Sequence, residues 1–170
     1  MNTDQIVKTL TSKQYTGIVD QLRPIFKDVP HLPAGVTNFL SMILPWLVGL
    51  GGIVSVISGI DLILNSFGFG INWWAQMIGF SPSYFLVSGI LQLVAGAVAL
   101  IAFNPLKNKL KTGWFLLFWG MVISLVQSVA GIILMPNQVG TDVVGMVIGL
   151  AIGLYLFFEI ESEYKKSSSK

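Results

Sequence analysis

Residues 82–103 read PSYFLVSGILQLVAGAVALIAF and contain no charged side chain. A helix rises about 1.5 Å per residue, so this run is long enough to cross the roughly 30 Å hydrocarbon core of a bilayer. Ser81 and Pro82 are typical of a helix start, because serine accepts a hydrogen bond from a free backbone N–H and proline suits the first helical position. Asn104 and Pro105 predict where the helix ends. The stretch therefore predicts a transmembrane helix.

Three further apolar runs have the same character, and they cover residues 37–64, 113–135 and 142–160. Each run is expected to be helical, because a backbone in hydrocarbon must satisfy its own hydrogen bonds and the alternating pattern of a β-barrel is absent. Pro45 predicts a kink in the first run. We therefore predict an all-α fold, an integral membrane four-helix bundle over residues 35–161.

The composition agrees with this fold class. The chain of 170 residues is 54% hydrophobic and 11% charged, with a mean hydropathy of +0.76 and a net charge of +2. Soluble domains have about a quarter of their residues charged. The chain has no cysteine, which excludes disulfides, thiol redox relays, iron–sulfur clusters and cysteine zinc sites. Its cations do not form a patch interleaved with aromatics, so nucleic acid is not expected as a partner.

The basic residues predict the orientation. All ten Lys and Arg lie before the first run, between the second and third runs, or after the fourth. The loops at 65–81 and 136–141 have none. Because cytoplasmic loops carry the excess of Lys and Arg, both termini and the 104–112 loop are expected in the cytoplasm. This predicts a multi-pass protein of the plasma (inner) membrane, in which residues 162–170 form a flexible cytoplasmic tail.

Residues 1–34 are amphipathic rather than apolar. The apolar stripe at helical spacing consists of Ile18, Leu22, Ile25, Phe26 and Val29. Pro24 interrupts the stripe and predicts two short helices. Two interpretations stay open: an interfacial helix on the anionic cytoplasmic leaflet, or an ordinary helix packed on the cytoplasmic end of the bundle.

The 65–81 loop is unusually aromatic, with Phe67, Phe69, Trp73, Trp74 and Phe80. One interpretation is a short helix in the headgroup region, where aromatic rings are favoured. The other is a lid over an outer cavity. The sequence leaves both open.

Polar side chains within the spans could form a path through the bundle. The candidates are Ser55, Ser58, Asp61, Ser88, Gln92, Ser124, Gln127 and Ser128. Such groups also form simple hydrogen bonds between helices, worth about 0.6 kcal/mol on average. Asp61 lies near the outer boundary, where it could bind a cation or pair with Asn65 a turn later. His31 is alone between prolines, and we interpret it as structural; Asp142 is interpreted as a residue near the N-terminus of a helix.

Small residues predict close helix packing. The packing lines comprise Gly51 and Gly59 in the first span, and Gly145, Gly149 and Gly153 in the fourth. Small residues at four-residue spacing let membrane helices approach one another, in the same chain or in another copy. In addition, GIVSVISG at 52–59 is similar to GILQLVAG at 89–96, which leaves an inverted repeat open.

Two segments carry a family resemblance. These are PLKNKLKTGW at 105–114, which leads into an apolar span, and YLFFEIESEY at 155–164. With them the chain resembles the small four-span membrane proteins of bacteria, and in size and helix number it is similar to the DoxX-like group. Neither resemblance implies an activity, so no site residue follows from it.

The sequence therefore predicts binding rather than chemistry. The spans contain no Lys, Arg or His and no paired carboxylates, so no catalytic residue, metal ligand or cofactor site is expected. We expect a non-enzymatic protein of the lipid bilayer, an assembly or interaction subunit of a membrane complex or homo-oligomer. The alternative is a small transporter or channel-like protein with a polar path between its helices.

Overall fold

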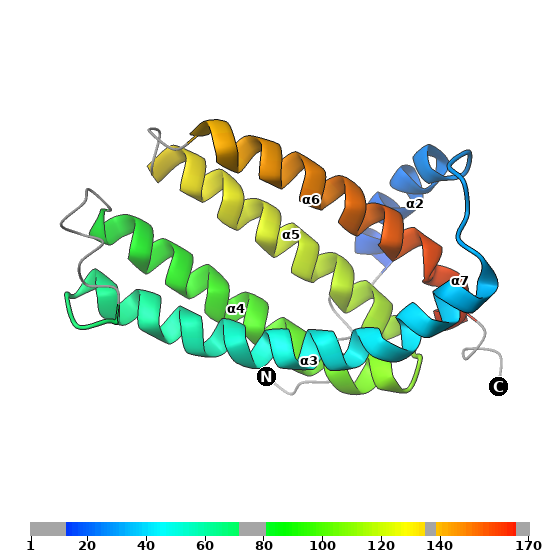
Figure 1. Cartoon of the computed structure of the whole chain (residues 1–170), viewed down its shortest axis with the longest axis horizontal. Helices are drawn as coiled ribbons and strands as arrows, with labels where there is room; N and C mark the ends of the chain where they lie inside the picture. The colour runs from blue at the N-terminus through cyan, green and yellow to red at the C-terminus, as the bar shows by residue number, and fades with distance from the viewer. Residues whose placement is uncertain (1–12, 72–80, 135–138, 166–170) are drawn as a thin grey trace.

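The computed structural model of the chain describes residues 13–71, 81–134 and 139–165. Within these ranges all regular secondary structure is helical (Figure 1), which confirms the all-α prediction. The helices are α2 (Lys13–Phe26), α3 (Ala34–Ser66), α4 (Pro82–Lys107), α5 (Lys111–Leu134), α6 (Val139–Glu159) and α7 (Glu161–Lys165).

Three of these helices, α3, α4 and α5, are long and apolar enough to cross a membrane. Helix α6 is apolar over the shorter range Val143–Glu159. The chain thus has the helices of a membrane protein.

The start of α4 is confirmed, since the Ser81 hydroxyl oxygen accepts a hydrogen bond of 3.1 Å from the Tyr84 N–H. Its end was predicted too early. The helix continues through Pro105 to Lys107, because the N–H of Asn108 bonds to the carbonyl of Asn104 and the missing N–H of the proline lies within the helix's final turns.

The predicted start of the fourth run was too late. Helix α6 begins at Val139, so residue 142, where the run was expected to start, lies inside the helix. The helix α2 also differs from the prediction, because Pro24 lies within one continuous helix rather than between two. Pro24 is close to the end of α2. Proline lacks a backbone N–H and crowds the preceding turn, but at this position only the last residues of the helix are affected.

Glycines bring α3 and α4 into close antiparallel contact. A Cβ atom on Gly96 would lie 3.0 Å from the carbonyl oxygen of Gly52, and one on Gly89 would lie 2.9 Å from that of Gly59. These four glycines are the ends of the two similar segments 52–59 and 89–96. The two segments therefore pack against each other, glycine opposite glycine.

The four long helices form a row in the order α3, α4, α5, α6 (Figure 1). Each helix packs against its neighbour in the chain. Helices α3 and α6, at the two edges of the row, share no extended contact among the described residues. The row is therefore open on the side between α3 and α6.

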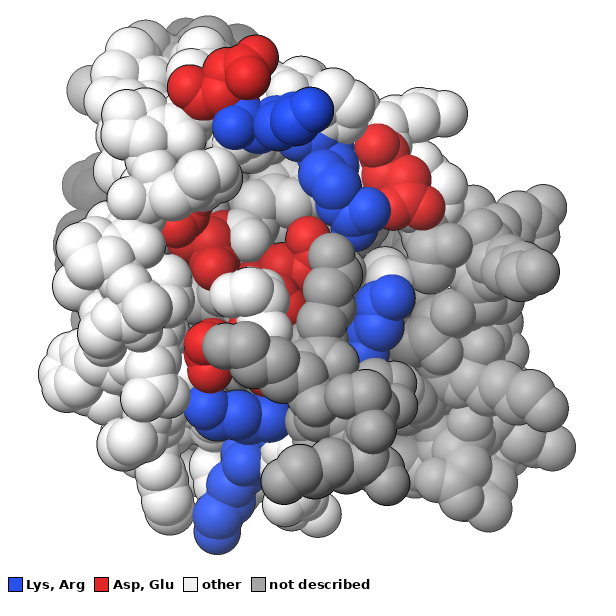
Figure 2. Space-filling model, turned by 90° about the vertical axis from the view of Figure 1, so that its right-hand side faces the viewer, with Lys and Arg blue, Asp and Glu red and all other residues white. Residues whose placement is uncertain are grey.

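The buried core lies at one end of the row, where α2, the 107–111 turn and α7 meet; we call this the charged end. The Trp114 ring is fully buried there, stacks on Phe157 at 4.1 Å, and donates a hydrogen bond of 2.8 Å from Nε1 to the Phe157 carbonyl. Val19 of α2 and Tyr164 of α7 complete the core. Figure 2 shows acidic and basic side chains gathered around it.

This core changes the interpretation of the C-terminus. Residues 162–170 were predicted as a flexible tail, but residues 161–165 form α7, and the Tyr164 side chain is fully buried. Burying an aromatic ring stabilises the helix that carries it. The last five positions, 166–170, lie outside the described residues.

Candidate functional site

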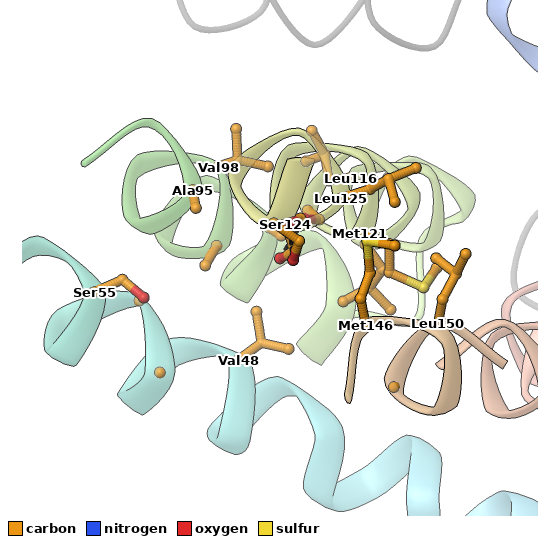
Figure 3. Close-up of a pocket in the computed structure, with 18 of the residues that line it drawn as sticks. Val48, Ser55, Ala95, Val98, Leu116, Met121, Ser124, Leu125, Met146 and Leu150 are labelled. Atoms are coloured by element: carbon orange, nitrogen blue, oxygen red, sulfur yellow. Dashed lines mark hydrogen bonds between the residues drawn. The ribbon is translucent and has the colours of Figure 1, made fainter. Parts of the chain in front are cut away.

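A cavity of about 590 Å³ lies among the four long helices (Figure 3). All four contribute to its wall: α3 with Ser55, α4 with Ala95, α5 with Ser124, and α6 with Met146 and Leu150. Most of the lining is apolar, and many of its side chains are short. The cavity exists because glycine, alanine and serine on neighbouring helices fill so little of the space between them.

Three of the predicted polar residues line this cavity: Ser55, Ser124 and Ser128. The Ser124 hydroxyl donates to the Gly120 carbonyl at 3.0 Å, and the Ser128 hydroxyl donates to the Ser124 carbonyl at 3.0 Å. Both hydroxyl groups thus donate their hydrogen bonds within α5. The oxygen atoms of these two residues keep lone pairs that can accept one further hydrogen bond from the cavity.

The other polar candidates do not line the cavity. Ser88 is only 2% exposed, next to the glycine contact of α3 with α4. Ser58, Gln92 and Gln127 are half-buried and lie outside the cavity lining. Within the described ranges, neither glutamine shows a hydrogen bond to another helix. The structure therefore places Ser55, Ser124 and Ser128 at one cavity, and it leaves Ser58, Ser88 and both glutamines outside it.

Asp61 lies near the end of α3, where it binds the turn that follows the helix, and it does not line the cavity. Its Oδ2 accepts a hydrogen bond of 3.0 Å from Asn65 Nδ2, and its Oδ1 accepts one of 2.8 Å from the backbone N–H of Ile71. The pairing with Asn65 is one of the two roles that the sequence left open. The aromatic loop lies partly outside the described residues, since 72–80 are not described.

The predicted packing glycines fall into two groups. Gly59 contacts α4 closely, with its Cβ position 3.0 Å from the Gly89 carbonyl oxygen. Gly51, Gly145 and Gly149 line the cavity, and a Cβ atom there would meet nothing within 4 Å.

Gly153 is intermediate, because a Cβ atom there would lie 3.4 Å from the sulfur of Met121. Within the described chain, the α6 line thus meets a neighbour only at this position. The other two glycines of this line, Gly145 and Gly149, face the cavity.

A second cluster, at the charged end, holds three segments together. Each of three alternating glutamates binds a basic side chain from a different segment. The pairs are Arg23 with Glu161 at 2.6 Å, His31 with Glu159 at 2.7 Å, and Lys109 with Glu163 at 3.3 Å. Helix α2, the segment before α3 and the turn between α4 and α5 are therefore all tied to the end of α6 and to α7.

Further contacts reinforce this cluster. Glu159 Oε2 accepts a hydrogen bond of 2.8 Å from the backbone N–H of Leu32, and the Tyr155 hydroxyl donates one of 2.8 Å to the Pro30 carbonyl. Burial raises the pKa of Tyr164 to about 12, and the neighbouring Glu163 carboxylate adds to the rise. The sequence signal for this cluster is the glutamates at every second position, 159, 161 and 163, of which the last lies in the segment predicted as a flexible tail.

The wall of the cavity is largely apolar. Among the described residues, no group of three or more His, Cys, Asp and Glu side chains could hold a metal ion. No ionisable side chain lines the 590 Å³ cavity. What the cavity offers a ligand is an apolar wall with a few hydroxyl groups.

The chain was compared with protein-family models, with curated proteins and with solved structures. None of them matches it. The resemblance to small four-span bacterial membrane proteins stays a prediction, and function is argued from the geometry of the cavity and the charged end.

Proposed function

We propose that the chain is a non-enzymatic, multi-pass protein of the plasma (inner) membrane, with α3, α4, α5 and α6 crossing the bilayer and both termini in the cytoplasm. The described parts of the three basic segments, which are α2, the 107–111 turn and α7, meet at the charged end, as cytoplasmic segments would. Helix α6 has 21 residues, which span about 31 Å, so it is also long enough to cross.

In this placement α2 is a cytoplasmic helix that packs on the bundle. Val19 is buried in the core, and Phe26 stacks on Phe158 of α6 with ring centroids 5.0 Å apart. Ile25 stays exposed on another side of α2. That side is available to the lipid headgroups, so the packed and interfacial interpretations of α2 are compatible.

We further propose that the protein acts as an assembly or interaction subunit of a membrane complex or homo-oligomer. The observation that carries this proposal is the unpartnered line of small residues on α6. Gly145 and Gly149 would allow another membrane helix to approach closely, and no helix of the described chain fills that space. The partner helix would lie along the edge of the row formed by α6.

Cross-linking in membranes tests this association. The chain has no cysteine, so Ile148→Cys, exposed on α6, gives a single reactive site. We expect a cross-linked adduct at this position, and loss of the adduct when Gly149→Leu is added. Ala97→Cys on α4 is the control position, also exposed. A monomer by mass in mild detergent, with no adduct at Ile148→Cys in membranes, would refute the proposal.

The second candidate function is a small transporter or channel-like protein. The observation that favours it is the meeting of Ser55, Ser124 and Ser128 at one cavity. A transport path must hold water, at least transiently, and the cavity would then admit water-soluble reagents. The labelling experiment in the next section measures this property directly.

A further inference from the structure

We propose that the cavity is a binding site for one hydrocarbon chain of a membrane lipid, which enters sideways from the bilayer between α3 and α6. The proposal rests on the membrane placement proposed above, and it does not depend on the association of α6 with a partner. It assigns a ligand class to the cavity that lies among the four long helices.

The first argument is size. A volume of about 590 Å³ is typical of small-molecule sites, which occupy roughly 300–1,000 Å³. Apolar space of this size is unfavourable when empty, because the atoms of its wall lose their packing partners. A flexible hydrocarbon chain can fill a space of irregular shape and restore these contacts.

The second argument is the chemistry of the wall. The side chains that line the cavity are apolar or carry a hydroxyl group, and none is ionisable. The hydroxyl groups of Ser124 and Ser128 donate hydrogen bonds to backbone carbonyls of α5. Neither donor therefore needs a water molecule in the cavity. The wall therefore suits methylene groups, and it offers nothing to neutralise a headgroup, which would stay outside.

The third argument is access. Helices α3 and α6 share no extended contact, so the cavity opens between them. The two helices on either side of this opening carry exposed apolar side chains, among them Leu50 and Val54 on α3 and Val147 on α6. Toward the charged end the cavity stops at Ala102 and Leu116, which belong to the buried core. The opening thus leads to hydrocarbon rather than to the cytoplasm.

A nitroxide label at Ser124→Cys tests what fills the cavity. The labelled protein is reconstituted in vesicles of phosphatidylethanolamine and phosphatidylglycerol, and its relaxation is measured with oxygen, which enters hydrocarbon, and with a water-soluble nickel chelate. We expect a strong oxygen effect and no nickel effect. A nickel effect would show a water-filled path, and the absence of both effects would show a protein-filled space; either result overturns the proposal.

The same label at Ala97→Cys is the matched control, because Ala97 is exposed on α4 and does not line the cavity. Membrane placement predicts a strong oxygen effect there. If Ala97→Cys shows none, the membrane placement fails and the lipid proposal fails with it. If Ala97→Cys shows the effect and Ser124→Cys does not, the lipid proposal alone fails.

A cavity-filling variant gives an independent measurement. A Cβ atom at Gly120 would meet nothing within 4 Å, so Gly120→Leu extends into the cavity without a backbone clash. Native mass spectrometry after delipidation should show a retained phospholipid on the unmodified chain and on Ala97→Leu, and its loss on Gly120→Leu. Equal retention on all three proteins would contradict the proposal.

Discussion

Arg23 Nη2 lies 2.6 Å from Glu161 Oε1, although 138 positions separate the two residues in the chain. The Glu161 side chain is only 9% exposed. Asp20 contacts the same guanidinium group at 3.1 Å. The pair thus ties α2, at the start of the described chain, to α7, at its end.

Glu161→Gln is expected to loosen α2 without unfolding the long helices. The amide cannot compensate the Arg23 charge, but Arg23 is partly exposed and can regain water, so the cost should be about 1 kcal/mol. Hydrogen exchange of residues 19–26 should then be roughly fivefold faster. Lys27→Ala, at the position directly after α2, is the control, since Lys27 forms no ion pair among the described residues. Equal exchange in both variants would contradict a role for the Arg23 pair.

Trp114→Phe is expected to destabilise the charged end. The substitution removes the hydrogen bond from Nε1 to the Phe157 carbonyl and leaves a buried acceptor without it, at a cost of about 1–3 kcal/mol. The measurement is loss of helix by circular dichroism as sodium dodecyl sulfate is added to mild micelles. Trp46→Phe is the control, because Trp46 is 55% exposed, and it should change stability by about 0.5 kcal/mol or less. Equal effects would contradict the core described for this end.

Gly89→Ala is expected to separate α3 from α4. The new methyl group would lie 2.9 Å from the Gly59 carbonyl oxygen, which cannot move without its helix, so the cost should be about 1–3 kcal/mol. Gly51→Ala adds the same methyl group to α3, where it meets nothing within 4 Å. That control should be neutral or stabilising in the same detergent titration. A destabilised Gly51→Ala with an unchanged Gly89→Ala would refute the glycine contact.

The raised pKa of the buried Tyr164 side chain predicts a loss of folding stability at alkaline pH. Its folded pKa is raised from 10.0 to about 12, so the folded state retains the proton while the unfolded chain ionises. The contribution of this group is therefore constant below pH 10 and is lost as the pH rises from 10 to about 12.

Thermal unfolding at several pH values across this range checks the prediction. Tyr164→Phe should lose less stability than the unmodified chain over the same interval, because the ring no longer ionises. At neutral pH the variant should be as stable or more stable, since the Tyr164 hydroxyl is buried and finds no hydrogen-bond partner among the described residues. Parallel loss of stability in both proteins would contradict the burial of Tyr164.

The helices could be predicted because their signals are local. The length of an apolar run, a Ser-Pro start such as Ser81–Pro82, and the grouping of Lys and Arg are all written within short stretches of chain. Exact ends were harder to predict. Pro105 was interpreted as a stop, but one missing N–H near the end of a helix costs little when the following residues close the last turn.

The cavity could not be predicted, because it depends on how each helix is turned about its axis. Successive helical residues point about 100° apart, so Gln127 and Ser128 face different directions although they share the same depth. Only Ser128 lines the cavity. The role of the glutamates at 159–163 could not be predicted either. A solvated acidic segment and a set of ion pairs have the same composition. Only the fold, which brings the N-terminal segment beside the glutamates, distinguishes the two.

Cysteine labelling in cells tests the central claim most directly, that four helices cross the membrane with both ends inside. The cysteine-free chain accepts single cysteines at Phe69, Asn108 and Ser162, all exposed in the structure. An impermeant maleimide should label Phe69→Cys in intact cells, and should label Asn108→Cys and Ser162→Cys only after permeabilisation. Labelling of Ser162→Cys in intact cells would show that only three helices cross the membrane. Labelling of Asn108→Cys with protection of Phe69→Cys would show the opposite orientation. Either result would contradict four crossings with both termini inside.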